Sequence, residues 1–232
     1  RQRRRRPAFY IMRKLKLWLR RLVAVAGLLI AAFYLTAAGV LIALRWVNPP
    51  TTALQIERLV QALAGGRRYV KRQLVVPLSE IPAHLRHAVI AAEDSRFYQH
   101  HGIDWEELRI VLRENAEQGR LGRGASTITQ QLVKNLFLTD ARSVVRKGVE
   151  FTLAPLAELI LTKNRILELY LNVVEWGPGI YGAQAASQFH YGVPVSRLSR
   201  EQSARLAAIL PSPLRRKPAR MNSYSAEILA RM

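Results

Sequence analysis

The chain has 232 residues, enough for one well-packed domain and a short additional segment. It carries 36 lysines and arginines against 16 aspartates and glutamates, which gives a net charge of +20. Such a charge suits nucleic acid, an acidic membrane surface or an anionic substrate as a partner. The chain contains no cysteine, so disulfides and thiolate metal sites are excluded.

About half of the excess positive charge lies in a short N-terminal segment. Ten basic residues precede Leu22, and the first acidic residue is Glu57. Residues 46–232 carry 25 basic and 16 acidic residues, a net charge of +9. Because an apolar run directly follows the basic segment, we expect a lipid surface rather than nucleic acid to be its partner.

The apolar run covers residues 22–44 and contains no charged residue. As a helix it would span about 34 Å, enough to cross a hydrocarbon core of about 30 Å. Trp18 and Trp46 bracket the run at the depths that indole rings prefer, and the basic residues before it favour a cytoplasmic N-terminus. We therefore predict a basic cytoplasmic tail at 1–21, a transmembrane helix at 22–46 and a single domain at 47–232.

A cleaved signal peptide is the alternative to a membrane anchor. Its apolar core would cover about 7–15 residues and would end in a small-residue cleavage site. This run is longer and ends in Leu44, Arg45 and Trp46, so an uncleaved anchor is favoured. Gly39 and Ala43 have a spacing that can pair membrane helices, although an ordinary lipid-facing stretch is the simpler interpretation.

The remainder of the chain has mainly helical patterns, which predicts a mainly α fold. Apolar residues recur at helical spacing from Leu54 until Gly65, and residues 69–78 look extended. Further helices are expected at residues 84–92, 105–118, 128–137, 144–161 and 165–174. Ser199, with Gln202 at capping-box spacing, opens the last clear helix. No convincing run of alternating strand residues is present.

The first segment that could carry chemistry contains Glu93 and Asp94, which follow the small apolar stretch Ala88–Ala92. Two acids at the end of a buried-looking helix are unfavourable unless they are paired or used. Apolar surroundings raise the pKa of a carboxyl group and make it a better proton acceptor near neutrality. The alternative is a helix-end acid in a salt bridge with Arg96 or His100.

The second segment, residues 122–135, resembles an anion-binding loop and helix. Thr127 and Gln130 have capping-box spacing, so a helix is expected to begin there with free N–H groups and a partial positive charge. Lys134 lies on the same helical face as Gln130. The P-loop spacing is absent, and an ordinary capped helix is the alternative.

The third segment places Arg146, Lys147 and Glu150 within one helical turn. Its alternative is a surface ion pair worth a few tenths of a kcal/mol. In the fourth segment, residues 163–172, the apolar positions are interpreted mainly as core, and Glu175 after it as a structural acid. No His-Glu-x-x-His or Asp-x-Asp pattern occurs, so no metal site is predicted from these motifs. No nucleophile elbow surrounds any serine.

In this order and spacing, the four segments resemble the glycosyltransferase family that polymerises lipid II into peptidoglycan glycan strands. The matching motifs are Glu-Asp-x-x-Phe-x-x-His-x-Gly at 93–102, Gly-Ala-Ser-Thr-Ile-Thr-Gln-Gln-x-x-Lys-Asn at 124–135, Arg-Lys-x-x-Glu at 146–150 and Ile-Leu-Glu-x-Tyr-Leu-Asn at 166–172. The resemblance runs from about Tyr69 to the C-terminus, with its motif core at about 82–213. It departs from the family pattern at Gln184 and at residues 190–192, outside the four motifs.

The chain ends at Met232 without room for a penicillin-binding transpeptidase domain, so it is similar to the monofunctional biosynthetic branch of the family. That branch implies a single-pass protein of the cell inner membrane of Gram-negative bacteria, with a periplasmic, lysozyme-like helical domain and a cleft between two lobes. The implied donor is a glycan linked to undecaprenyl pyrophosphate, and the implied acceptor is lipid II.

The resemblance also implies roles for individual residues. Glu93 would remove the proton from the acceptor's 4-hydroxyl, which attacks the donor with inversion. Glu150 would assist departure of the pyrophosphate, directly or through a divalent cation such as Mg²⁺ or Mn²⁺. The implied substrate-binding residues are Lys134, Arg146 and Lys147 for the pyrophosphate, and Ser126, Gln130, Gln131 and Asp94 along the cleft.

Two other functions stay open at this stage. A lytic, lysozyme-like enzyme would share the fold and the key glutamate but would not explain the cations at positions 134, 146 and 147. A non-enzymatic scaffold for cell-wall assembly would need no catalytic acid. Expected partners are lipid II, the lipid-linked glycan strand and the membrane; cell-division or cell-wall synthesis proteins stay open as partners, and nucleic acid is not expected.

Overall fold

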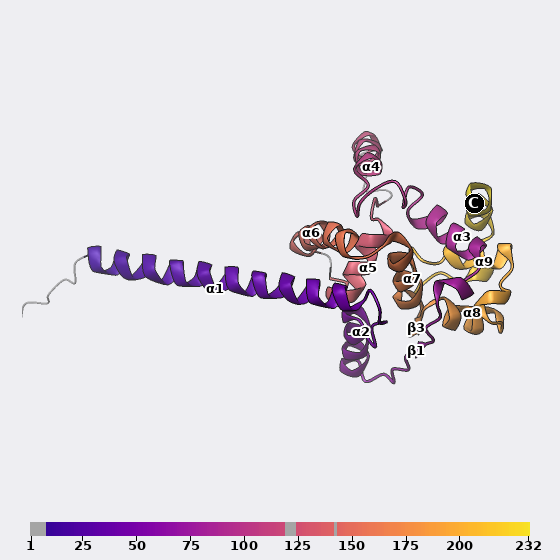
Figure 1. Ribbon diagram of the computed structural model, residues 1–232, viewed down its shortest axis with the longest axis horizontal. Helices are drawn as coiled ribbons and strands as arrows, with labels where there is room; N and C mark the ends of the chain where they lie inside the picture. Colours follow the sequence, from indigo (N-terminus) through magenta and orange to yellow (C-terminus); the bar gives the residue numbers. More distant parts are fainter. Residues whose placement is uncertain (1–7, 119–123, 142) are drawn as a thin grey trace, which may run out of the picture.

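The computed structural model describes residues 8–118, 124–141 and 143–232, and this part of the chain is mainly helical (Figure 1). The arginines at positions 1 and 3–6 and the Gly122-Arg123 pair, all singled out in the sequence, lie outside it. The α-helices are α1 (Ala8–Ala43), α2 (Ala53–Ala64), α3 (Ala83–Glu93), α4 (Trp105–Gln118), α5 (Ile128–Phe137), α6 (Val144–Ile160), α7 (Lys163–Val173), α8 (Ala183–Tyr191), α9 (Arg200–Ala207) and α10 (Asn222–Arg231).

Helix α1 projects from the rest of the molecule as one long rod (Figure 1). Its segment Met12–Ala43 is a candidate membrane span by length and composition, and the part from Leu22 onward carries no charge. Only its C-terminal part packs on the domain, where it contacts α6. Ala37 and Leu41 lie one turn apart and are 2% and 0% exposed. Gly39 has open space around it, so this contact uses a different face of α1 from the one that carries Gly39.

The C-terminal end of α1 is also fixed by polar contacts. Arg165 donates from Nε to the carbonyl of Leu44 at 2.7 Å and from Nη2 to the carbonyl of Val47 at 2.6 Å. These carbonyls follow the end of a helix, where backbone acceptors lack intrahelical partners. The hydroxyls of Tyr34 and Thr152 share a hydrogen bond farther along α1. The apolar helix and the domain are therefore one packed unit at this end.

The domain helices form two groups. In the first, α5 packs against α2, α6 and α7; in the second, α9 packs against α3 and α10. The apolar positions of α5 recur at helical spacing and are buried. Both expected capping boxes are present, Thr127 with Gln130 at the start of α5 and Ser199 with Gln202 at the start of α9.

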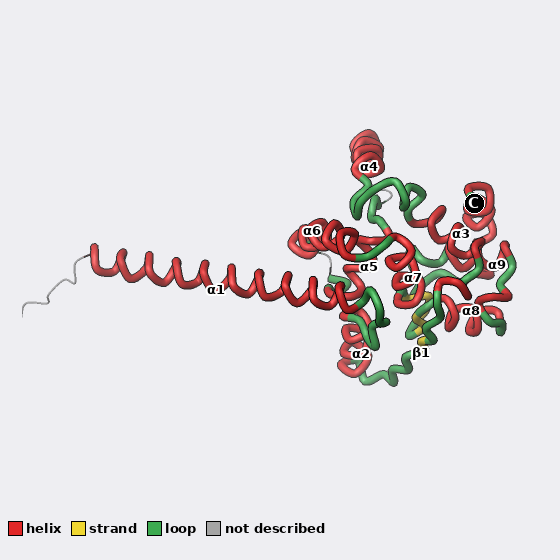
Figure 2. The backbone as a smooth tube through the Cα atoms, viewed as in Figure 1, coloured by secondary structure: helices red, strands yellow, loops and turns green. Residues whose placement is uncertain are grey.

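Three elements differ from the sequence-based expectation. Figure 2 shows a small sheet, whose strand order is β1 (Arg72–Gln73), β3 (Ile180–Tyr181) and β2 (Glu175–Gly177). Strand β1 runs parallel to β3, and β2 runs antiparallel to it. Strands of two or three residues are too short to show alternation. The sequence-based expectation also lacks the helices α8 and α10. Because α10 follows α9, the expectation that Ser199 opens the last clear helix is wrong.

Candidate active site

A cleft of about 850 Å³ lies between the two helix groups. The second group contributes the end of α3 and the segment 210–216, and the first contributes α5 and α6. All the predicted site residues line this cleft except Gln130: Glu93, Asp94, Ser126, Gln131, Lys134, Arg146, Lys147 and Glu150. The structure therefore brings together predicted site residues that lie up to 57 positions apart in the chain, from Glu93 to Glu150.

Glu93 is the last residue of α3, where the helix meets the cleft. Burial and, to a smaller extent, the charge of Asp94 raise the pKa of its carboxyl group, although a hydrogen bond from Gln131 and the charges of Arg216 and Lys134 act in the opposite direction. Its Oε2 accepts a hydrogen bond from Gln131 Nε2 at 2.6 Å. Among the described residues, its buried Oε1 has no hydrogen-bond partner. Glu93 therefore keeps one carboxylate oxygen outside its hydrogen bond with Gln131.

A second hydrogen bond orients the amide of Gln131, and its donor is Tyr170, in the segment whose apolar positions were expected mainly in the core. Tyr170 of α7 is fully buried, and its hydroxyl donates to Gln131 Oε1 at 3.0 Å. With Oε1 facing a donor, the amide nitrogen must point toward Glu93. The chain Tyr170, Gln131, Glu93 thus fixes the position of the carboxylate through two hydrogen bonds.

Asp94 joins three segments at the floor of the cleft. His100 Nε2 lies 2.9 Å from its Oδ1, and the backbone N–H of Ile128 donates to its Oδ2 at 2.9 Å. The carboxylate therefore caps the N-terminus of α5. The alternative considered for this segment, a helix-end acid paired with His100, describes Asp94 and not Glu93.

Gln130 departs from the expectation that it lines the cleft. Its side chain is 1% exposed, and its Oε1 accepts the backbone N–H of Thr127 at 3.0 Å. The capping box therefore uses this side chain for the start of α5. Thr127 in turn donates from its hydroxyl to the carbonyl of Gly102 at 2.6 Å.

Gly102 lets the first motif come close to α6. Its φ is +88°, a conformation that side chains disfavour, and a Cβ added there would lie 2.7 Å from the carbonyl carbon of Ala154. The glycine of the Glu-Asp-x-x-Phe-x-x-His-x-Gly motif is thus required by backbone packing.

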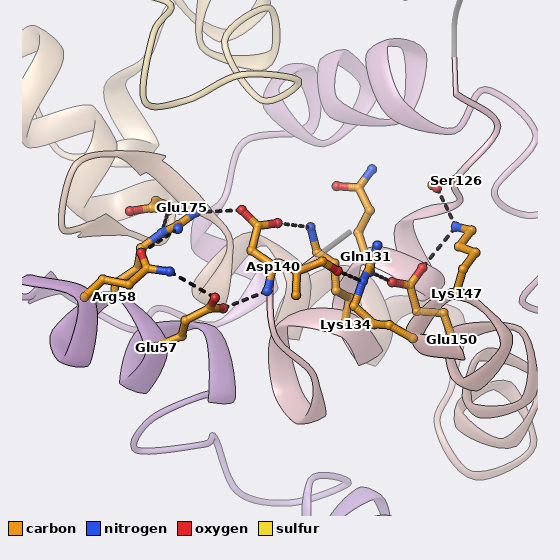
Figure 3. Close-up of polar contacts among 12 residues, drawn as sticks. Glu57, Arg58, Ser126, Gln131, Lys134, Asp140, Lys147, Glu150 and Glu175 are labelled. Carbon is orange, nitrogen blue, oxygen red and sulfur yellow. Dashed lines mark hydrogen bonds and ion pairs between the residues drawn. The ribbon is translucent and has the colours of Figure 1, made fainter. Parts of the chain in front are cut away.

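Two cations of the cleft pair with Glu150, which is 3% exposed, and Figure 3 shows the contact with Lys147. Arg146 pairs with its Oε1, and Lys147 Nζ lies 3.0 Å from its Oε2. Lys147 also donates to the Ser126 hydroxyl at 2.8 Å. The expected alternative, a surface ion pair, is wrong because the carboxylate is buried.

The lysine of this cluster has an unusual proton affinity. Burial, together with the positive charges of Arg146 and Lys134, lowers the pKa of Lys147 to about 8. It is therefore still mainly protonated at neutral pH, and an anionic ligand would stabilise its charged form. A cluster of cations at a helix N-terminus is suited to a ligand with several negative charges.

The residues around Glu150 do not fit a divalent cation at that carboxylate. Hard cations need oxygen ligands in number, and here both carboxylate oxygens already pair with cations. The side chains of Asp94, His100 and Asp104 come close enough to share an ion, a grouping that the sequence analysis missed. Each of these side chains already has a partner, because His100 binds Asp94 at 2.9 Å and Asp104 pairs with Arg96 at 3.2 Å.

The sequence of this chain is similar to those of known proteins of one family. The model of the family described as Transglycosylase matches residues 58–232. A relative from Pseudomonas putida (strain W619), named biosynthetic peptidoglycan transglycosylase, is 46% identical over 198 residues, 84% of each chain. A protein of the same name from Pseudomonas aeruginosa is 45% identical over 193 residues, 83% of each chain. One from Rhodospirillum centenum is 44% identical over 207 residues, 89% of this chain and 85% of its own. The chain therefore belongs to the transglycosylase family.

Proposed function

We propose that this chain is a peptidoglycan glycosyltransferase that polymerises lipid II into glycan strands for the cell wall. The growing lipid-linked strand is the donor, lipid II is the acceptor, and undecaprenyl diphosphate is released. One observation carries the proposal: a single cleft holds a carboxyl group with a raised pKa and a cluster of three cations. The names of the relatives support the same substrate class.

Glu93 is the general base of this reaction. Its carboxylate accepts the proton of the acceptor's 4-hydroxyl, and the hydroxyl oxygen attacks the donor's anomeric carbon. The bond from that carbon to the diphosphate oxygen breaks as the new glycosidic bond forms. Attack from the face opposite the leaving group inverts the configuration at the anomeric carbon. The raised pKa makes Glu93 a stronger base than an exposed glutamate.

Lys134, Arg146 and Lys147 bind the diphosphate and stabilise the negative charge that develops as it leaves. Glu150 holds Arg146 and Lys147 through its two carboxylate oxygens and so assists departure by orienting them. This mechanism uses no divalent cation at Glu150. A diphosphate site also argues against a lytic enzyme, since hydrolysis of a glycan needs no such site.

The proposed location follows from the lipid nature of both substrates. Residues 22–46 span the inner membrane once, residues 1–21 stay in the cytoplasm, and residues 47–232 form the periplasmic glycosyltransferase domain. Because Tyr34, Ala37 and Leu41 of this span pack on the domain, the adjoining part of α6 reaches into the bilayer, which supports a cleft close to the membrane surface. The proposal includes no transpeptidase activity.

The test is incubation of the purified full chain, in detergent, with lipid II. We expect a polymer that lysozyme digests, together with release of undecaprenyl diphosphate. Cleavage of isolated sacculi without any polymer would instead assign a lytic activity. Absence of both activities, with the protein folded, would favour a scaffold.

A further inference from the structure

The cation at the outer end of the diphosphate cluster already has an anionic partner within the chain. Lys134 Nζ lies 3.5 Å from Asp140 Oδ1, and Asp140 Oδ2 lies 3.0 Å from Arg58 Nη2. Figure 3 shows Asp140 between these two cations, one from α5 and the other from α2. Both cations and the carboxylate line the cleft.

Asp140 is held firmly from the side of α2. Arg58 is 17% exposed and also pairs, at 3.1 Å, with Glu175, whose side chain is 4% exposed. The backbone N–H of Asp140 donates to Glu57 Oε2 at 2.7 Å. Burial lowers the pKa of Arg58, but the charges of Glu175 and Asp140 outweigh this effect and raise it, so Arg58 stays charged. Glu175, predicted to be structural, is thus the buried partner that holds Arg58 next to Asp140.

The contact on the other side is weaker. A charge-assisted N–H to O contact is usually about 2.7–2.9 Å long, and the Lys134 contact is longer. The side chains of Lys134 and Asp140 are 28% and 44% exposed, so water competes for both. Lys134 can therefore exchange Asp140 for another anion while Arg58 and Glu57 keep Asp140 in place.

We propose that Asp140, positioned by Arg58, competes with the substrate's diphosphate for Lys134 and thereby limits how tightly this end of the cleft holds diphosphate. The inference rests on the proposed role of Lys134. A bound diphosphate replaces the carboxylate at Lys134, so its binding must first break this ion pair. The lost ion pair weakens binding of the donor's diphosphate and of the released product alike, which prevents the cleft from retaining its product.

The experiment measures binding of inorganic pyrophosphate to the full chain in detergent by calorimetry. We expect Asp140→Asn to bind pyrophosphate about 2–5-fold more tightly, the range for one partly exposed ion pair. Lys134→Gln should bind it more weakly, and Asp140→Asn should have no further effect when combined with Lys134→Gln. Glu201→Gln removes a carboxylate whose partner is Arg205, outside the cleft, and should leave the affinity unchanged.

The outcomes separate the two proposals. Unchanged or weaker binding by Asp140→Asn would overturn the inference while a loss in Lys134→Gln would still support the diphosphate site. Equal tightening with and without Lys134 would also overturn it, because the effect would then be one of general charge. No effect of Lys134→Gln on its own would refute the proposed role of Lys134, and the inference with it. Thermal unfolding of each variant confirms that the fold is intact.

Discussion

The hydroxyl of Tyr170 donates to Gln131 at 3.0 Å, on the side of the amide opposite Glu93. This bond decides which end of the amide faces the carboxylate. We expect Tyr170→Phe to lower kcat about 5–10-fold with little change in KM, because about 1 kcal/mol of orientation is lost. Steady-state kinetics with lipid II provides the measurement.

The matched control for that variant is Tyr69→Phe. It also removes one tyrosine hydroxyl. That hydroxyl donates to the Tyr181 hydroxyl at 3.0 Å and makes no contact with Gln131 or Glu93 in the described part of the chain. Both variants should lower the unfolding temperature to a similar extent, but only Tyr170→Phe should lower kcat. A full kcat in Tyr170→Phe would show that the hydrogen bond does not orient Gln131.

Replacing Glu93 by glutamine removes the proposed base while keeping its size. We expect polymerisation to fall about 10²–10⁴-fold, the usual contribution of a general base. The initial rate of polymer formation measures this loss, and circular dichroism checks the fold. Glu201→Gln makes the same chemical change in an exposed ion pair and should keep its rate. Near-normal activity in Glu93→Gln would contradict the assigned role.

The pH dependence of kcat/KM should have two limbs. As the pH falls through the pKa of Glu93, which burial raises, the base becomes protonated and activity is lost at a higher pH than for an ordinary glutamate. As the pH rises through about 8, Lys147 loses its proton and the diphosphate site loses a charge. The arginine of Lys147→Arg keeps its charge at higher pH, so this variant should shift only the alkaline limb, and shift it to higher pH. An unmoved alkaline limb would assign that limb to another group.

The packing of α1 on the domain predicts a difference between two leucines of the same helix. Leu41 is fully buried against the domain, whereas Leu35 is 74% exposed. Leu41→Ala should destabilise the folded protein by about 2–5 kcal/mol through the cavity it leaves. Leu35→Ala should leave the unfolding temperature nearly unchanged. Thermal unfolding in detergent compares them, and equal transitions would mean that α1 is only a tether.

Two glycines near the site should respond oppositely to alanine. At Gly102 the backbone φ of +88° and the contact with Ala154 disfavour any Cβ, so Gly102→Ala should destabilise the protein by about 1–3 kcal/mol or more. Gly148 is exposed within α6 and has open space around it, so Gly148→Ala should stabilise the helix by about 1 kcal/mol. Chemical denaturation measures both, and a tolerated Gly102→Ala would contradict the close approach to α6.

Much of the fold could be predicted because its signals are local. Capping boxes at Thr127 and Ser199 and the apolar spacing of α5 depend on residues within a few positions of one another. The short strand Ile180–Tyr181 could not be predicted, since its pairing with Arg72–Gln73 bridges over a hundred residues and two positions cannot show a period.

The site was predictable through its motifs, but several roles were not. Gln130 belongs to a motif yet serves the capping box, and Tyr170 looked like core because its hydroxyl partner lies 39 positions away. The contact between Arg58 and Glu175 joins residues 117 positions apart. A single sequence gives no sign of such pairings, because neither residue is unusual in its own segment.

The clamp of Arg165 on the end of α1 has a mechanical consequence. With α1 in a bilayer as proposed, the helix and the cleft tilt together, because no flexible joint separates them at Leu44 and Val47. A helix that is longer than the local hydrocarbon thickness adjusts by tilting. Bilayer thickness would then change the height and angle at which the cleft meets lipid head groups. The rate of glycan synthesis should therefore vary with acyl-chain length in vesicles, even when the substrate concentration is constant.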